Sequence, residues 1–318
     1  MRLPIIIGLL GTTLSEAEKV FLQKNKPLGV LLLARNFDYT STDWIEIAKN
    51  LVSDIYNCIN EKQVLITLDH EGGRVHRTPG GITHFSTARE YKDSAFETGQ
   101  IMASEIKQFG CNLSWAPVCD IDSNPDNPII GTRAFACTAD EVIKPAIEMM
   151  KGLHSKNVLS CAKHFPGHGD TNLDSHLALP SVDKSLEEIK QCELIPFQAI
   201  INAGVPTIMT AHILYPQIDK ENPATFSKFW LQEILRDELQ FKGVTISDDI
   251  EMKAVSNRFE TPQGFHQAID AGCDVFIVSR HFHTDGKFLE IAAEAYKTLP
   301  KELSRNLSES ITRIQMLF

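Results

Sequence analysis

Short, nearly continuous runs of Val, Ile and Leu recur along the whole chain. Runs of this length are typical of parallel β-strands that are buried on both faces of a sheet. The pattern predicts eight such strands, at residues 5–8, 29–33, 64–69, 112–118, 158–164, 207–212, 244–248 and 274–279.

Segments with the apolar periodicity of amphipathic helices lie between these runs. They cover residues 15–23, 44–60, 88–109, 139–154, 186–203 and 228–239, and two more close the chain at 287–296 and 304–318. Ser185, Ser227 and Thr261 can cap the first turn of a helix, and Gly204 and Gly272 stand where a helix is expected to end. Strand and helix therefore alternate throughout.

The alternation favours a single α/β domain, a (β/α)₈ TIM barrel that spans residues 1–318. The chain has no Gly/Ser-rich linker, internal repeat or low-complexity segment, although its length of 318 residues would also permit two smaller domains. A doubly wound open sheet is the alternative. It is disfavoured because Gly8 and Gly11 lack the GxGxxG spacing and no Walker sequence occurs.

The charge balance argues against nucleic acid as a partner. Lys and Arg total 31 against 41 Asp and Glu, a formal net charge of -10, and no basic stripe interrupts the acidic surface. No run approaches the roughly 18 apolar residues that a membrane span needs. We expect a small-molecule substrate, no membrane contact and no obligate protein partner.

Cysteine usage and the N-terminus indicate where the protein works. The seven cysteines are odd in number, form no CxxC pair and fall largely in apolar segments, which favours free thiols in a reducing compartment, the cytoplasm. Arg2 and the apolar run 3–10 resemble a short signal peptide, but residues 12–16 offer no cleavage pattern. We interpret the run as the first barrel strand.

Polar residues stand at the ends of the apolar strands and in three long loops, at 70–81, 120–135 and 165–180. In a barrel these positions share the C-terminal face, where active sites are built, although any one residue can simply cap a helix or pair at the rim. The strand-end set is Asp69, Lys163, His164, His212, Asp248, Asp249 and Arg280.

The densest polar segment, 163–176, reads KHFPGHGDTNLDSH. It permits either a metal site of His and Asp ligands or a general acid/base with an orienting carboxylate. The end of the first strand, residues 8–11, has no side chain that binds a metal, so we expect no metal and no cofactor.

This segment resembles the signature loop of the β-N-acetylglucosaminidase branch of glycoside hydrolase family 3. GVLLLARN (29–36), LDHEGGRV (68–75), NPIIGTRAF (127–135) and VTISDDIEM (244–252) are similar to further family motifs in the same order, so the likeness covers nearly the whole chain. The resemblance implies a bacterial, cytoplasmic β-N-acetylhexosaminidase of the compact, one-domain form.

Three catalytic roles follow from the resemblance. Asp248 matches the nucleophile that forms a covalent glycosyl-enzyme, whereas Asp249 fits better as a cap for the turn that follows. His176 matches the general acid/base, and Asp174 matches the carboxylate that orients it. A histidine titrates near neutral pH, and an acidic neighbour supports its protonated form.

The resemblance also implies a set of sugar-binding residues, namely Asp69, Arg77, Arg133, Lys163 and His164. Two departures from the family pattern bear on fine specificity: His70 stands where Gln is common, and Lys253-Ala254 where Glu-Gly is common.

The activity implied is retaining removal of terminal β-linked N-acetylglucosamine from peptidoglycan fragments during cell-wall recycling. The expected substrate is N-acetylglucosaminyl-1,6-anhydro-N-acetylmuramic acid, with or without its peptide. A catalytically silent sugar-binding barrel and an exo-β-glucosidase are the alternatives; the first would lose nucleophile or acid, and the complete 163–176 motif argues against the second.

Overall fold

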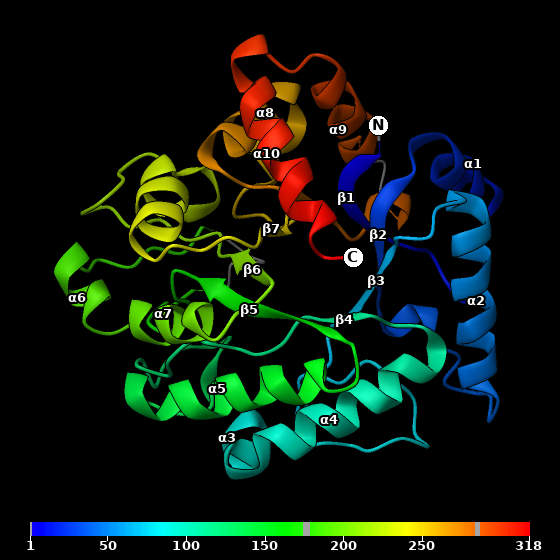
Figure 1. The fold of residues 1–318 in the computed structure, drawn as a ribbon, viewed down its shortest axis with the longest axis horizontal. Coiled ribbons are helices and arrows are strands. Elements are labelled where there is room, and N and C mark those ends of the chain that lie inside the picture. Colours follow the sequence, from blue (N-terminus) through cyan, green and yellow to red (C-terminus); the bar gives the residue numbers. More distant parts are fainter. Residues whose placement is uncertain (1, 174–178, 284–286) are drawn as a thin grey trace.

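The computed structural model describes residues 2–173, 179–283 and 287–318. Eight parallel strands pair in sequence order and close into a barrel, which confirms the predicted (β/α)₈ fold (Figure 1). The strands are β1 (Leu3–Gly8), β2 (Pro27–Leu32), β3 (Leu65–Leu68), β4 (Leu113–Ser114), β5 (Leu159–Phe165), β6 (Thr207–Thr210), β7 (Val244–Asp249) and β8 (Val275–Val278).

Helices surround the barrel, and the last of them crosses one end of it (Figure 1). Their bounds are α1 (Glu16–Asn25), α2 (Trp44–Ile59), α3 (Ala88–Tyr91), α4 (Ala95–Ile106), α5 (Ala139–His154), α6 (Leu186–Lys190), α7 (Leu194–Asn202), a π-helix (Phe229–Glu238), α8 (Pro262–Ala271), α9 (Phe288–Lys297) and α10 (Ser304–Gln315). Ser15 and Ser185 begin α1 and α6 through reciprocal capping with Glu18 and Glu188. Gly272 ends α8 at a φ of 119°, a conformation that glycine adopts without strain.

Two predicted helices are interrupted in the structure, and one predicted strand is shorter than expected. The run 186–203 divides into α6 and α7, because Pro196 has no N–H and is accommodated only in the first turn of a new helix. The run 88–109 divides at Lys92–Ser94, where the Ser94 hydroxyl bonds the Tyr91 carbonyl. Regular strand β4 covers only two of the predicted residues, 112–118, although bonds from Cys161 N to Ala116 O and from Cys119 N to Lys163 O continue its pairing with β5.

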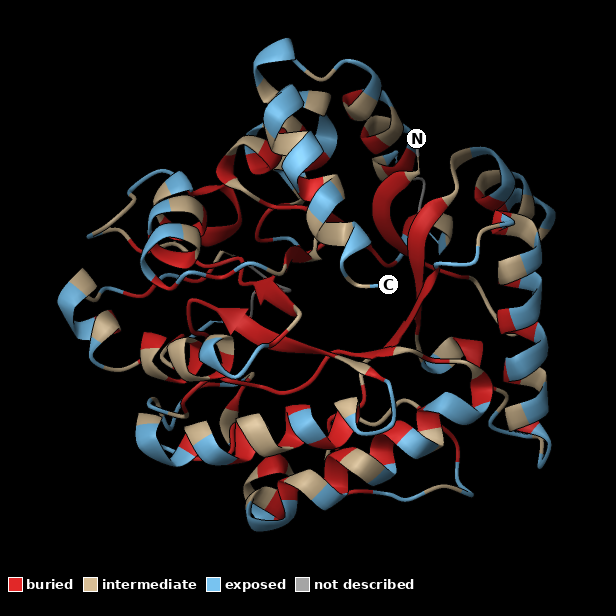
Figure 2. Cartoon of the chain, in the orientation of Figure 1, coloured by how far each residue is buried: buried red, intermediate tan, exposed pale blue. Residues whose placement is uncertain are grey.

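Two apolar layers hold the barrel together. One fills the interior and includes Ile6, Leu65, Trp115 and Ile246, with Ile314 from α10 and Leu317 packed against it. The larger layer lies between the strands and the surrounding helices. Figure 2 shows the strands almost entirely buried and the helices buried on only part of their surface. The strand ends opposite α10 thus remain open for a site.

All seven cysteines are free thiols, as the sequence predicted. Within residues 2–173, 179–283 and 287–318, no helix is long and apolar enough to cross a bilayer.

Candidate active site

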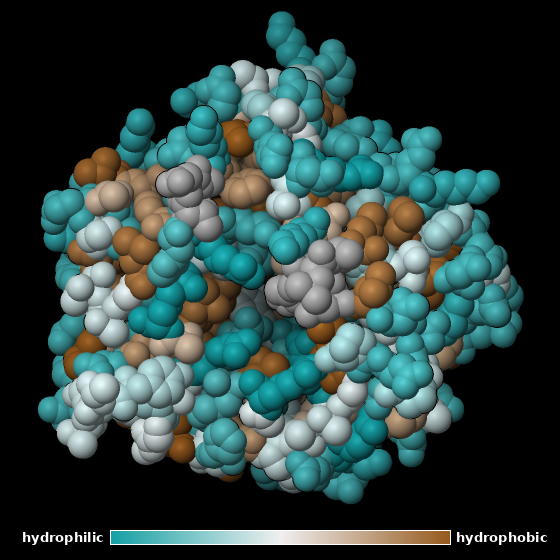
Figure 3. Space-filling model, turned by 180° about the vertical axis from the view of Figure 1, so that it is seen from behind, coloured by the Kyte–Doolittle hydropathy of each residue, from teal (hydrophilic) through white to brown (hydrophobic). Residues whose placement is uncertain are grey.

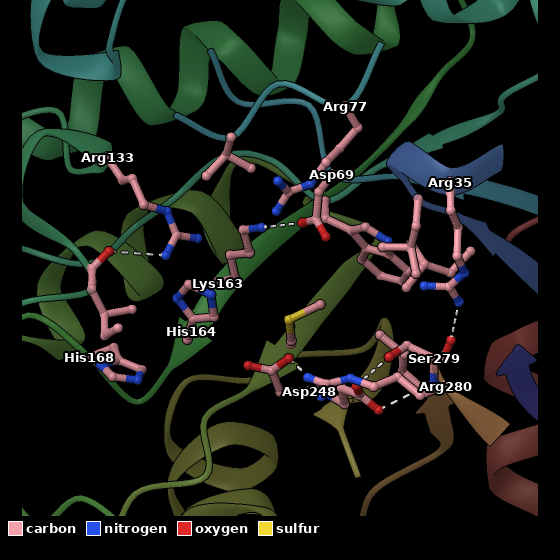
Figure 4. Close-up of a pocket in the computed structure, with 18 residues that line it drawn as sticks. Arg35, Asp69, Arg77, Arg133, Lys163, His164, His168, Asp248, Ser279 and Arg280 are labelled. Atoms are coloured by element: carbon pink, nitrogen blue, oxygen red, sulfur yellow. Dashed lines mark hydrogen bonds and ion pairs between the residues drawn. The ribbon is translucent and has the colours of Figure 1, made fainter. Parts of the chain in front are cut away.

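A pocket of about 300 Å³ opens among the loops that follow the strands (Figures 3 and 4). The six predicted site residues that the structure describes all line it: Asp69, Arg77, Arg133, Lys163, His164 and Asp248. They come from four different segments of the chain, and barrel closure brings them together. Leu31, Trp115, Met209 and Ile277 complete the wall with apolar surface.

Asp248 lies near the end of β7 and is half-buried. Burial alone would raise the pKa of its carboxyl, but His164 and His212 and a 2.7 Å bond from the Asp249 amide hold the pKa below its usual value. Asp248 is therefore ionised at neutral pH. That is the state a nucleophile requires.

A buried ion-pair network occupies one wall of the pocket. Lys163 Nζ lies 2.9 Å from Asp69 Oδ1 and 2.5 Å from Glu71 Oε1. Glu71 is also held by Arg133 at two points, Nε to Oε2 and Nη2 to Oε1, each at 2.8 Å. Burial raises the pKa of Glu71, but the two cations more than offset this and lower it. The network fixes both cations at the pocket surface, where their remaining donors can bind hydroxyl groups.

His164 is oriented by a second buried carboxylate. Its Nδ1 lies 2.7 Å from Asp120 Oδ2, and Asp120 Oδ1 accepts a 2.7 Å bond from the His168 amide. Asp120 is 1% exposed; burial would raise its pKa, but His164 and His168 hold it low. His164 Nε2 is thereby left to face the pocket as a hydrogen-bonding group.

The loop 120–135, which follows β4, anchors the beginning of the loop 165–180, which follows β5. Asn127 Nδ2 donates to the carbonyls of His168 and Gly169 at 2.8 and 3.0 Å. A Cβ added at Gly169 would lie 1.5 Å from the Ile121 carbonyl oxygen, so the two loops touch through backbone. This contact requires glycine at position 169 of the predicted signature loop.

Three further sequence predictions concern the acid/base pair, Asp249 and a metal site. Asp174 and His176, the predicted acid/base pair, lie outside the described residues. Asp249 does cap the turn after β7, because its Oδ1 accepts bonds from the Glu251 and Ser279 amides at 3.2 and 3.3 Å. Within the ranges described, no group of three His, Cys, Asp or Glu side chains is placed to hold a metal ion.

His70, one departure from the family pattern, does not line the pocket. Its ring is fully buried, 4.8 Å from the ring of His76 and edge-on to Phe85. Burial, with smaller contributions from His76 and His84, lowers its pKa to about 3. His70 therefore packs within the loop 70–81 and does not contact the pocket.

Glu71 and Asp120 were not among the predicted site residues. Each stands two residues after the end of a predicted strand, and Glu71 lies inside the LDHEGGRV motif, so closeness to a strand end was the signal that could have identified them. Asn127 stands at the start of the NPIIGTRAF motif in the same way.

Residues 6–317 match the model of the glycosyl hydrolase family 3 N-terminal domain. The chain belongs to this family. It is 37% identical to a β-hexosaminidase of Idiomarina loihiensis over 283 residues, which cover 86% of this chain and 83% of that protein. The family resemblance seen in the motifs is thereby confirmed.

Two solved structures share the fold. NagZ from Neisseria gonorrhoeae, in complex with N-trifluoroacetyl-D-glucosamine, superimposes with a TM-score of 0.83 at 31% identity and covers 98% of this chain and 90% of its own. A family 3 β-N-acetylglucosaminidase from Paenibacillus sp. str. FPU-7 has a TM-score of 0.90 at 31% identity; 99% of this chain spans only 60% of that protein.

Proposed function

We propose that this family 3 enzyme is a retaining exo-β-N-acetylglucosaminidase. The observation that carries the proposal is an ionised, half-buried Asp248 in a pocket whose wall presents Lys163, Arg133 and His164. A pocket of about 300 Å³ is at the small end of ligand sites and suits one terminal sugar rather than an internal stretch of polysaccharide. The similarity to the Paenibacillus β-N-acetylglucosaminidase supports N-acetylglucosamine as that sugar.

The reaction proceeds in two steps in this proposal. An Asp248 oxygen attacks the anomeric carbon as the glycosidic bond breaks, and protonated His176 gives its proton to the departing oxygen. Neutral His176 then takes a proton from water, which attacks the same carbon and releases Asp248. Asp174 orients the imidazole and supports its positive charge.

Asp69, Arg77, Arg133, Lys163 and His164 hold the sugar in this proposal. Binding energy from hydroxyl groups remote from the reacting carbon is thereby used to orient it over Asp248. No step requires a metal or a cofactor.

The proposed substrates are peptidoglycan fragments such as N-acetylglucosaminyl-1,6-anhydro-N-acetylmuramic acid, with or without peptide, recycled in the cytoplasm. Seven free thiols are consistent with a reducing compartment. Residues 1–318 act as one catalytic barrel domain in this view, without an obligate protein partner, nucleic acid or membrane.

The test is hydrolysis of nitrophenyl β-N-acetylglucosaminide beside the corresponding glucoside, with wild type and Asp248→Asn. We expect the N-acetylglucosaminide alone to be cleaved, the variant to be nearly inactive but folded, and a fluorinated slow substrate to label Asp248. Preferred cleavage of the glucoside would indicate an exo-β-glucosidase. Sugar binding without turnover by wild type would indicate a silent barrel.

A further inference from the structure

Cationic side chains gather at the pocket in a protein whose net charge is -10, beside the carboxylates of Asp69, Asp248 and Asp249. Five cationic side chains line it: Arg35, Arg77, Arg133, Lys163 and Arg280. Glu71 and Asp69 neutralise two of these, Arg133 and Lys163, through the buried network. The other three have no such partner in the described part of the chain.

Arg35 and Arg280 belong to the same wall. Figure 4 places them beside Ser279, away from His164 and His168. Arg35 donates to the backbone carbonyls of Leu9 and Ser279, which hold its guanidinium without cancelling its charge. Arg280 is exposed, and none of the described carboxylates forms an ion pair with its guanidinium.

Two acids lie on this wall, and both are engaged by hydrogen bonds from residues 279 and 280. Asp249 bonds the Ser279 hydroxyl, and burial raises the pKa of its carboxyl. Glu251 accepts the backbone amide of Arg280; burial and the neighbouring Asp249 raise the pKa of Glu251 to about 7. Neither carboxylate is paired with the guanidinium of Arg280 in the described ion pairs, so that guanidinium is left to meet an incoming anion.

Burial distinguishes the inner part of the pocket from its mouth. Lys163 and His164, two of the five proposed sugar-holding residues, are only 2% and 6% exposed and lie deep, whereas Asp69, Arg77 and Arg133 are half-buried. Arg280 is exposed and lines the same cavity, so it stands nearer the opening. A group attached to the bound sugar must leave a blind pocket through its mouth and pass this guanidinium.

We propose that Arg280 binds a carboxylate on the group attached to the sugar and makes the enzyme prefer acidic leaving groups. The inference rests on the proposed glycosidase function and deepens it. A guanidinium presents paired N–H donors that match the two oxygens of a carboxylate, whereas a neutral N-acetylglucosamine needs no charge there.

The test uses two nitrophenyl β-N-acetylglucosaminides that carry a carboxylate or a carboxamide at the same ring position. The readout is the ratio of kcat/KM for the acid to that for the amide, which is compared between proteins so that intrinsic differences between the leaving groups cancel. We expect Arg280→Gln to lower this ratio about fivefold, the size of an exposed charge pair, and Arg280→Lys to retain part of it. High salt should lower the wild-type ratio, because it screens an exposed pair.

Arg305→Gln is the matched control, because it removes the same charge from α10, where Arg305 is 88% exposed. Its ratio should equal that of wild type. An unchanged ratio in Arg280→Gln, or equal loss on both substrates, would overturn the inference while leaving the glycosidase intact. If wild type cleaves neither glycoside, the proposed function fails and the inference with it.

Discussion

Glu71→Gln should damage stability and sugar binding together, because one carboxylate fixes two cations. Glu71 is 3% exposed, and its two oxygens receive Lys163 Nζ and two nitrogens of Arg133. Gln has nearly the same shape but no charge, and its NH₂ group is a donor that faces other donors. Lys163 retains Asp69 at 2.9 Å, whereas Arg133 loses its only carboxylate partner in the described chain.

Removal of one partner from a buried pair costs about 3–5 kcal/mol. We expect the low end, about 3 kcal/mol of unfolding free energy, because Gln fills the same volume and keeps one acceptor. The folded-state pKa of Glu71 is depressed, so its charge stabilises the fold above the unfolded pKa of about 4.3, and this contribution is lost as pH falls further. The difference in unfolding free energy between wild type and Glu71→Gln should therefore become smaller below about pH 4.

Urea denaturation, monitored by tryptophan fluorescence, measures the difference in unfolding free energy between wild type and Glu71→Gln at several pH values. The value of kcat/KM on the nitrophenyl glycoside measures the effect on the active site. Glu61→Gln is the control, since it removes an exposed ion pair with Lys26. KM should rise in Glu71→Gln, because Arg133 loses its carboxylate partner and Lys163 keeps only Asp69. If Glu71→Gln and Glu61→Gln have the same stability and the same kcat/KM, the network does not organise the pocket.

Three further predictions address the remaining groups. His176→Ala should lose much more activity on a disaccharide than on a nitrophenyl glycoside, and azide should speed its turnover; equal loss on both without rescue would place the acid/base elsewhere. Exhaustive chelation should leave activity unchanged, and recovery of a lost activity with zinc would restore the metal hypothesis. His70 has a depressed pKa of about 3, so wild type should lose stability as pH falls from about 6.5 towards 3, and His70→Leu should show a shallower loss in acid denaturation midpoints.

The sequence alone was sufficient to predict the barrel fold and the polar residues at the ends of its strands. Asp69, Lys163, His164 and Asp248 terminate apolar runs, and a closed parallel barrel has one end at which such residues meet. Their partners could not be assigned in the same way. Glu71 and Arg133 are 62 residues apart, and a buried glutamate looks like an exposed one in a sequence. Asp120 pairs with His164 across 44 residues for the same reason.

The division of charges around the pocket also bears on how Asp248 acts. Asp69 and Glu71 satisfy Lys163 and Arg133, so these cations do not form a direct ion pair with Asp248, the proposed nucleophile, and none of the described ion pairs includes Asp248. His164, His212 and, to a smaller extent, Lys163 lower the pKa of Asp248 without an ion pair, and one backbone amide donates to its carboxylate. Asp248 is thus kept ionised without a cation bound to its oxygens. A carboxylate in that state can attack without first breaking an ion pair, which requires that Glu71 and Asp69, rather than Asp248, neutralise the buried cations.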